Sequence, residues 1–155
     1  MSTTSWKLPL DAGCRCGRIR MQVTQVPLMA SACHCTGCQR MSASAFSLTL
    51  TLPRDGLSVR GETVLGGLHG EVQHHHCDHC KSWVFTRPPG DLPFVNLRAT
   101  LLDDASWFQP YVETWTSEKL PWAQTGAAHS YATQPELSEY QALAAAYQTN
   151  GARPR

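Results

Sequence analysis

The seven cysteines of this 155-residue chain restrict its fold more than any other feature, because they stand in three short clusters. The clusters have the spacings C-x-C, C-x-C-x-x-C and C-x-x-C, and they are formed by Cys14 and Cys16, by Cys33, Cys35 and Cys38, and by Cys77 and Cys80. Such spacings let neighbouring thiolates bind one metal ion through a tight turn. An odd number of cysteines cannot all pair in disulfides, so we interpret the clusters as metal ligands.

Length and charge narrow the class of protein further. A chain of 155 residues suits one domain with one hydrophobic core. The formal net charge of +1 provides no electrostatic footprint for nucleic acid or for an acidic membrane surface. No stretch approaches the roughly 18 apolar residues of a transmembrane helix. Residues 1–10 contain one lysine and no apolar core, so we expect no secretory signal and a cytoplasmic protein with reduced thiols.

Alternation of apolar and polar residues predicts that much of the chain is β-strand. In the segment 45–52, Leu48, Leu50 and Leu52 face one way and the threonines between them face the other. The proline and glycine in 53–56 predict a turn after this strand. The expected strands are 17–26, 45–52, 63–68, 72–76, 83–87, 94–101 and 111–116.

Only the C-terminal region has a clear helical pattern. Pro135 fits the first position of a helix, and Gly151 fits its end. Between them, an apolar stripe at helical spacing is formed by Leu137, Tyr140, Ala144 and Tyr147, with Leu143 beside it. We therefore predict a mainly β fold of antiparallel sheets, with a helix over about 135–149 that packs against the body of the domain.

The C-x-x-C of Cys77 and Cys80 lies between two expected strands, which distinguishes it from a redox motif. A redox C-x-x-C usually opens a helix after a strand. Here the motif forms the tip of a hairpin, as in zinc ribbons, so we favour a metal ion. Four thiolates complete the tetrahedron of a zinc ion, and we predict a structural zinc bound by Cys14, Cys16, Cys77 and Cys80.

The remaining Cys33, Cys35 and Cys38 lie within six residues and can converge on a second metal ion. Three protein ligands with one open position are typical of a zinc ion that takes part in chemistry. Soft thiolate ligands favour zinc or copper(I) over magnesium or calcium. The open position suits a water molecule or a substrate thiol.

A histidine at the fourth position is the alternative for this second site. His34 lies inside the loop, but it is the weaker candidate because both of its neighbours are already ligands. His74, His75 and His76 lie on an expected strand beside the other cluster, with His74 and His76 on one face. We interpret this run as polar strand residues, one of which could act as an acid or base near the open site. His79 is the remaining histidine that could supply the fourth ligand.

Three segments together resemble a known family. They are Gly13-Cys14-Arg15-Cys16-Gly17, Cys33-His34-Cys35-Thr36-Gly37-Cys38-Gln39-Arg40 and His76-Cys77-Asp78-His79-Cys80. Their order and spacing are similar to those of the glutathione-dependent formaldehyde-activating enzyme family, which shares its domain with centromere protein V. Further similar segments are 42–46, 101–104 and 119–122, so the resemblance spans roughly residues 10–122.

The resemblance implies a β-tent (Mss-four-like) fold, in which antiparallel sheets are hinged at zinc. It implies a zinc-binding domain at 10–122 and a C-terminal extension at 123–155. It also implies a structural zinc at the four-cysteine set and a catalytic zinc at Cys33, Cys35 and Cys38. The family's namesake reaction, classed as a carbon–sulfur lyase activity, joins formaldehyde to glutathione and gives S-hydroxymethylglutathione. Glutathione or a similar small thiol is then the expected partner.

Two residues depart from the family's pattern. Lys81 follows the second C-x-x-C where glycine is usual, and Ala43 replaces a glycine beside the open site. A residue with a side chain adopts a positive φ only at an energetic cost. If the backbone has a positive φ at these two positions, this chain bears that cost.

Three classes of function remain open. The first is an enzyme that acts at carbon bonded to sulfur, with the three-cysteine metal as its centre and the serines of 42–44 as hydrogen-bond donors to the substrate. The second is a non-catalytic zinc module that binds a thiol, a peptide or a partner protein, and the third is metal handling or redox sensing. Asp103 and Asp104 are expected to cap a turn. DNA binding lacks support because no basic helix follows a cysteine pair.

Overall fold

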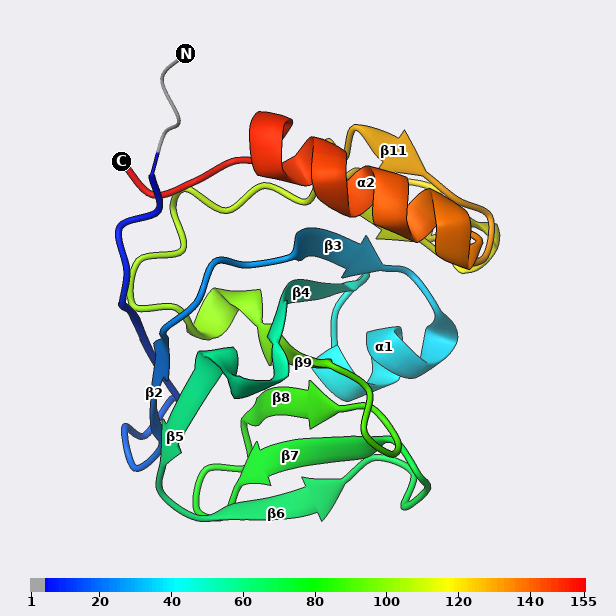
Figure 1. Ribbon diagram of the computed structural model, residues 1–155. Coiled ribbons are helices and arrows are strands. Elements are labelled where there is room, and N and C mark those ends of the chain that lie inside the picture. The colour runs from blue at the N-terminus through cyan, green and yellow to red at the C-terminus, as the bar shows by residue number, and fades with distance from the viewer. Residues whose placement is uncertain (1–4) are drawn as a thin grey trace.

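Two β-sheets of unequal size form the body of the fold in the computed structural model, which describes residues 5–155 (Figure 1). The expectation for residues 1–10 therefore lies partly outside the described residues. The smaller sheet has the order β1-β2-β5 and consists of β1 (Leu10–Gly13), β2 (Arg20–Val23) and β5 (Leu57–Arg60). The larger sheet consists of β3 (Met29–Cys33), β4 (Ser47–Pro53), β6 (Thr63–Gly66), β7 (Gln73–Cys77), β8 (Trp83–Arg87), β9 (Phe94–Arg98), β10 (Val112–Thr114) and β11 (His129–Ser130).

The larger sheet has the order β11-β10-β3-β4-β9-β8-β7-β6 and is mixed. Strand β10 pairs in parallel with both β3 and β11, whereas the other strand pairs described are antiparallel. The predicted mainly β fold of mostly antiparallel sheets with a C-terminal helix is confirmed, and the parallel pairs at this edge are an addition that the sequence did not predict. Parallel neighbours need a long connection, and most of the domain separates β3 from β10 in sequence.

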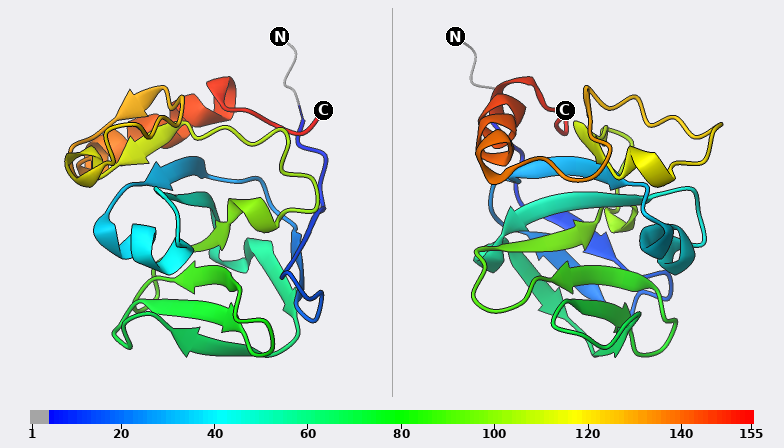
Figure 2. Two further views of the ribbon diagram at one scale, coloured as in Figure 1. Left: turned by 180° about the vertical axis from the view of Figure 1, so that it is seen from behind. Right: turned by 90° about the vertical axis from the view of Figure 1, so that its right-hand side faces the viewer.

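The two faces of the larger sheet differ in chemistry because side chains alternate along each strand. One face contributes Leu50, Leu52 and Leu97 to a hydrophobic core that also contains Met21 and Val23 of the smaller sheet. In the right-hand view of Figure 2, the strands of the smaller sheet pass behind those of the larger one. The opposite face is mostly polar: its polar residues on β4 and β9 are Ser47, Thr49, Thr51, Asn96 and Arg98, and Pro53 and Phe94 lie at one end of it.

Period-two alternation located the middle strands of the chain well. The strand expected at 83–87 matches β8 residue for residue, and those at 45–52 and 72–76 are shifted by one or two residues. The expected strands at 17–26, 63–68, 94–101 and 111–116 are each shorter in the structure, and 94–101 ends in a 3-10 helix at Ala99–Leu101. Alternation did not predict β1, β3, β5 or β11, because these strands are short or, like the Met-Ala-Ser-Ala-Cys of β3, have no clear polar face.

The C-terminal helix α2 (Leu137–Asn150) begins two residues later than expected. The side chains of Glu136 and Glu139 form a reciprocal capping box, which satisfies backbone amides at the first turn and leaves Pro135 outside. The helix lies across β3 (Figure 1) and buries Leu143 and Tyr147. Leu137 was expected in the buried stripe, but it is exposed because it stands at the helix start. Within the described residues, no helix is long and apolar enough to cross a membrane.

A second helix, α1 (Thr36–Ser42), was not predicted. It buries none of its residues, so it lacks the apolar stripe by which helices are recognised in sequence. Cys35 caps its start by accepting a hydrogen bond from the Cys38 amide. The carboxylate of Glu118, which is distant in sequence, accepts hydrogen bonds from the amide and hydroxyl of Thr36. Tertiary contacts therefore stabilise this helix.

Ala43 and Lys81, the two positions at which the resemblance leads one to expect glycine, both have positive φ. Ala43 has φ 50° and ends α1 in the left-handed conformation, and Lys81 has φ 60° directly after the second C-x-x-C. A Cβ atom in this region approaches the following carbonyl oxygen, which costs roughly 1–2 kcal/mol. At these two positions the chain therefore adopts, with non-glycine residues, a backbone conformation that favours glycine.

Replacing Ala43 by glycine is expected to stabilise the protein. The strain relieved is roughly 1–2 kcal/mol, and the greater freedom of the unfolded chain offsets about 0.4–1 kcal/mol of it. Denaturant unfolding of Ala43→Gly should therefore give a gain of about 0.5–1 kcal/mol. Ala128→Gly is the control, because Ala128 is also exposed but does not have a positive φ; it should lose stability. Equal losses in the two variants would contradict the backbone argument.

Candidate metal centres

The first candidate centre joins the two sheets. Cys14 and Cys16 follow β1, Cys77 ends β7, and Cys80 lies in the turn before β8, and their four sulfur atoms lie within 4.8 Å of one another. The Sγ atoms of Cys14 and Cys16 are 3.5 Å apart, and those of Cys16 and Cys77 are 3.8 Å apart. A tetrahedral zinc with bonds of about 2.3 Å to sulfur requires sulfur separations of about 3.8 Å. The donor set and its spacing therefore fit a zinc ion.

Two tight turns aim backbone amides at these sulfur atoms. In the first turn, the amide of Ile19 donates to the Sγ of Cys14 at 3.2 Å. In the second, the amide of Cys80 donates to the Sγ of Cys77 at 3.5 Å. Amide donors partly offset the charge that thiolates bring to a metal site. Lys81, which has a positive φ, closes the second turn. Its backbone amide donates to the carbonyl of Cys77.

The second candidate centre lies where β3 passes into α1. Cys33 is the last residue of β3, Cys35 caps the helix, and Cys38 lies in its first turn; their three sulfur atoms lie within 4.8 Å of one another. The amide of Cys38 donates to the Sγ of Cys35 at 3.3 Å. All three residues are half-buried. Among the residues that the structure describes, no histidine or carboxylate completes either group of thiols.

Crowding in both groups spreads the thiol pKa values apart. A hydrogen bond from Cys38, aided by the Cys35 backbone, lowers the pKa of Cys33 to about 5, and contact with Cys33 in turn raises the pKa of Cys38. In the first group, a hydrogen bond from Ser82 lowers the pKa of Cys80 to about 5. Without a cation, the thiolate of Cys33 opposes the ionisation of Cys38. A divalent metal removes this conflict because it attracts every thiolate.

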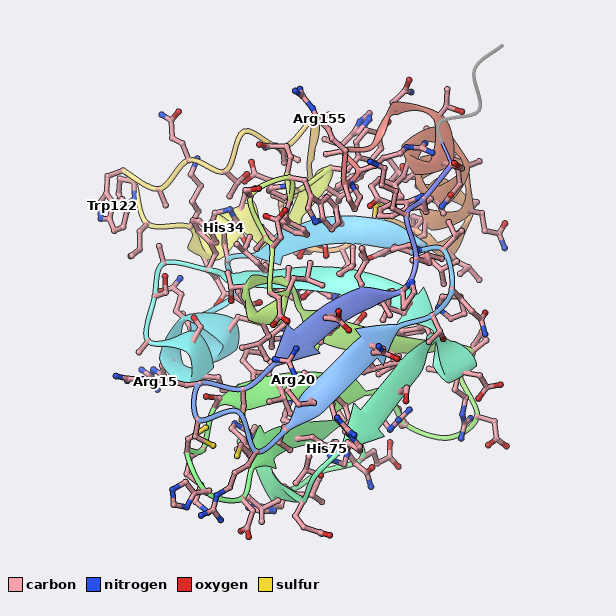
Figure 3. All side chains as sticks on the ribbon, turned by 90° about the vertical axis from the view of Figure 1, so that its left-hand side faces the viewer. Arg15, Arg20, His34, His75, Trp122 and Arg155 are labelled. Atoms are coloured by element: carbon pink, nitrogen blue, oxygen red, sulfur yellow. The ribbon has the colours of Figure 1, made fainter. Side chains whose placement is uncertain are left out.

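His34 is not placed as a ligand, although it lies between two of the cysteines. Its ring is fully buried, and its Nε2 lies 2.8 Å from the carboxylate of Glu113. Figure 3 shows the ring within the fold near the end of β3, whereas Trp122 projects from the surface. The ring also packs edge-on against Phe46. The histidine alternative for the fourth position therefore has no support at His34.

Glu113 is a buried acid that sequence analysis missed. Burial alone would raise its pKa, but hydrogen bonds from Ser130, His34 and Thr125 hold that pKa at about 2. The carboxylate is therefore ionised, and it fixes the loop of Cys33 and Cys35 through the ring of His34. One signal was available, because a glutamate in the middle of a strand that is otherwise buried is uncommon without partners.

A second acid, Glu118, holds the other side of the loop. Its carboxylate accepts from Thr36, and its backbone carbonyl accepts from the side-chain amide of Gln39 at 3.0 Å. The same amide also donates to the carbonyl of His34 at 2.7 Å. The cysteine loop is thus connected to the segment after β10 at several points, although about 80 residues separate the two in sequence.

The histidine run lies on β7 and contacts other residues of the larger sheet. The Nδ1 atoms of His74 and His75 lie 2.9 Å from the hydroxyls of Thr86 and Thr63, respectively. His75 stacks on Phe85, and His76 stacks on Trp83. None of these rings joins a group of thiols, so the interpretation as polar strand residues agrees with their contacts.

The remaining candidates from the sequence have local roles. The hydroxyl of Ser42 donates to the carbonyl of Cys38, inside α1. Asp103 forms an exposed ion pair with Arg20, and Asp104 accepts from the amide and hydroxyl of Ser106, as expected of a turn cap. Nothing in these contacts brings either aspartate to a group of thiols.

Two curated fungal proteins are similar to this chain, and both bear the name "Putative glutathione-dependent formaldehyde-activating enzyme". The protein from Penicillium rubens is 32% identical over 105 residues, which cover 63% of this chain and 55% of the relative. The protein from Podospora anserina is 26% identical over 112 residues, which cover 67% of this chain and 53% of the relative. The chain thus spans about half the length of these relatives.

A solved structure supports the fold independently. The crystal structure of a Rhodobacter sphaeroides protein superimposes with a TM-score of 0.51 at 20% identity, covering 61% of this chain and 88% of the other. At this identity the similarity concerns the fold alone.

The sequence model of one family matches residues 9–118, which include both candidate metal centres. This match covers well over half of the chain and ends at Glu118, the acid that contacts α1. The chain therefore belongs to the glutathione-dependent formaldehyde-activating enzyme family.

Proposed function

We propose that this protein joins formaldehyde to the thiol of glutathione at the three-cysteine cluster. The observation that supports this most is the incomplete ligand set, because three thiols lie within 4.8 Å of one another and no other ligand of the described residues joins them. A zinc ion held by Cys33, Cys35 and Cys38 would have one free position, at which it would hold a substrate thiol as the thiolate at neutral pH.

The four-cysteine set has a different role in this proposal. Four thiolates fill the tetrahedron of zinc and leave no position for a substrate. Its ligands come from the smaller sheet and from the β7–β8 hairpin, so a zinc ion there would hold the two sheets together. We therefore assign a structural zinc to Cys14, Cys16, Cys77 and Cys80.

The proposed reaction balances without an oxidant or a reductant. The sulfur of glutathione supplies the electron pair of the new carbon–sulfur bond, and the π pair of the formaldehyde carbonyl moves to its oxygen. The proton that the thiol loses is matched by the proton that this oxygen gains from solvent. The protein has to supply a thiolate at neutral pH and a fixed approach to the carbonyl.

Two acids make the ligand loop rigid enough for this task. Glu113 holds His34 from the interior, and Glu118 holds Thr36 from the opposite side. Cys35 lies between these two fixed residues. We infer that the two acids are positioning residues, which keep the three sulfur atoms at one distance from the metal.

Family membership and the names of the two fungal relatives also support this function. We propose that the catalytic domain covers 10–122 and that 123–155 is an extension folded onto it, since β11 pairs with β10 and Tyr147 lies in the common core. We also propose a cytoplasmic location, because metal-binding thiols of this kind persist in a reducing compartment.

Metal analysis tests the base of the proposal. The purified protein should contain about two zinc ions per chain, of which a mild chelator removes one quickly, because three ligands hold less tightly than four. Atomic spectroscopy before and after dialysis against the chelator gives both values. Less than one zinc per chain would contradict both assignments.

Single substitutions should separate the two centres. Cys77→Ser removes a ligand of the structural zinc, which contributes on the order of 10 kcal/mol to small sites, so the variant should unfold. Cys35→Ser should keep the fold and one zinc ion and lose the other. Circular dichroism and zinc content check both variants. Unfolding of both would show that the three-cysteine centre is structural too.

Glutathione binding and turnover test the reaction itself. Calorimetric titration of the two-zinc protein with glutathione should give heat, and S-methylglutathione, which lacks a free thiol, should give none. Carbon-13 formaldehyde with glutathione should then form S-hydroxymethylglutathione faster in the presence of the protein than of Cys35→Ser. Binding without faster turnover would favour the non-catalytic thiol-binding module instead.

Glu113→Gln should weaken the contact between residue 113 and His34, and with it the support of the ligand loop. The buried carboxylate accepts three hydrogen bonds, and replacing it leaves at least one donor poorly paired, which costs about 1–3 kcal/mol. Denaturant unfolding should show this loss, together with faster removal of the second zinc by the chelator. Glu71→Gln, at an exposed acid outside the described helices and strands, is the control and should change stability by less than about 0.5 kcal/mol. Equal behaviour of the two variants would exclude a positioning role for Glu113.

A further inference from the structure

Arg98, the last residue of β9, is a buried cation without an anionic partner. Its exposed fraction is 8%, and its Nε atom is buried without a hydrogen-bond partner. Among the described residues, the acids that form ion pairs do so with other cations, and none of them pairs with Arg98. Burying a charge costs free energy unless an opposite charge compensates it. We therefore expect an anion near Arg98 in the functional protein.

The strand register places Arg98 on the same face as the three-cysteine centre. Arg98 stands opposite Thr49 on β4, and Cys33 stands opposite Ser47 on the same strand. Thr49 and Ser47 are two residues apart and therefore point to one face of the sheet. Residues opposite each other in a ladder share a face, so Arg98 and Cys33 project from the same side on the two strands that flank β4.

Trp83 restricts where the guanidinium of Arg98 can lie. The guanidinium carbon is 4.0 Å from the centre of the indole ring, a cation–π distance. The indole is itself fixed, because its Nε1 donates to the hydroxyl of Thr86 and His74 packs edge-on against it. A buried guanidinium held by a fixed ring keeps a defined position in the polar face.

Two cysteines of the three-cysteine centre act electrostatically on Arg98. Burial lowers the pKa of Arg98 to about 10, while Cys38 and Cys33 act on this pKa in the opposite direction. Arg98 therefore stays protonated at neutral pH, and the two thiols that oppose the effect of burial belong to the three-cysteine centre. No carboxylate acts in this way on Arg98.

We propose that Arg98 is the counter-ion of the three-cysteine centre and compensates the negative charge that its thiolates place around a divalent metal. This inference rests on the proposed function. Three thiolates and one divalent cation have a net charge of −1, and a bound substrate thiolate makes it −2. The four-cysteine set has one exposed member, Cys16, so water can screen its charge. The half-buried three-cysteine centre needs a charge from the protein instead.

Arg98 is thus a positioning residue for the reaction, which acts through the charge of the centre rather than by contact with formaldehyde. It favours both the third thiolate ligand and the incoming substrate thiolate. Lysine at this position preserves the charge, whereas methionine preserves the apolar stem and removes the charge. The two substitutions therefore separate an electrostatic role from a packing role.

The experiment compares Arg98→Met, Arg98→Lys and wild type loaded with zinc, by competition with a chromophoric chelator. Arg98→Met should hold the second zinc about tenfold more weakly, because a unit charge near a half-buried site changes its affinity by about this factor. Arg98→Lys should stay close to wild type. The four-cysteine zinc should be unchanged in both variants, and its retention reports that the domain is folded. If Arg98→Met loses that zinc, Arg98→Gln takes its place.

Arg87→Met is the matched control. Arg87 also stacks on an aromatic ring, Phe85 at 5.2 Å, but it stands at the opposite end of β8 from Trp83. It should hold both zinc ions as wild type does. The counter-ion role would be overturned if Arg98→Met bound the second zinc as tightly as wild type, or if Arg98→Lys bound it more weakly than Arg98→Met. Neither result would contradict the proposed function. A wild type with a single zinc would overturn the proposed function and this inference with it.

Discussion

Four sulfur atoms from two different sheets converge between β1 and the β7–β8 hairpin, and the rest of the domain depends on this junction. Cys16 and Cys77 are 61 positions apart in the sequence, yet their sulfurs are 3.8 Å apart. Thiols this close oppose one another's ionisation: although the backbone of Arg18 lowers the pKa of Cys16, desolvation and its three neighbouring thiols raise that pKa to about 11. A divalent cation makes the junction attractive, because it favours every thiolate at once. The smaller sheet is then held where its apolar side chains join those of the larger sheet.

This junction leaves one face of the larger sheet for polar residues. The apolar face is used in the common core, so Thr49, Asn96 and Arg98 project on the other side. The three-cysteine loop leaves β3 on that side of the molecule. Water screens a cation on such a polar, half-buried face poorly, so the cation interacts strongly with thiolates nearby. The proposed reaction and the proposed counter-ion both depend on this separation of the two faces.

Residues far away in sequence fix the conformation of the loop that carries Cys33, Cys35 and Cys38. Glu113 holds His34 from within the fold, and Glu118 accepts from Thr36 at the start of α1. Helix α1 has no buried residue of its own, so its hydrogen bonds to the segment after β10 stabilise it. The positive φ of Ala43 is tolerated because the surrounding structure determines the end of this helix.

Sequence alone determined the features that depend on local pattern. The clustering of cysteines predicted two groups of ligands and the family, alternation predicted most strands of the larger sheet, and helical spacing predicted α2. These patterns are visible because each concerns residues close together in the chain. The parallel β10, helix α1 and the partners of Glu113 and Arg98 were decided by tertiary structure. Each of them depends on contacts between residues tens of positions apart, and the energy of such contacts is set by burial and register, which only the folded chain possesses.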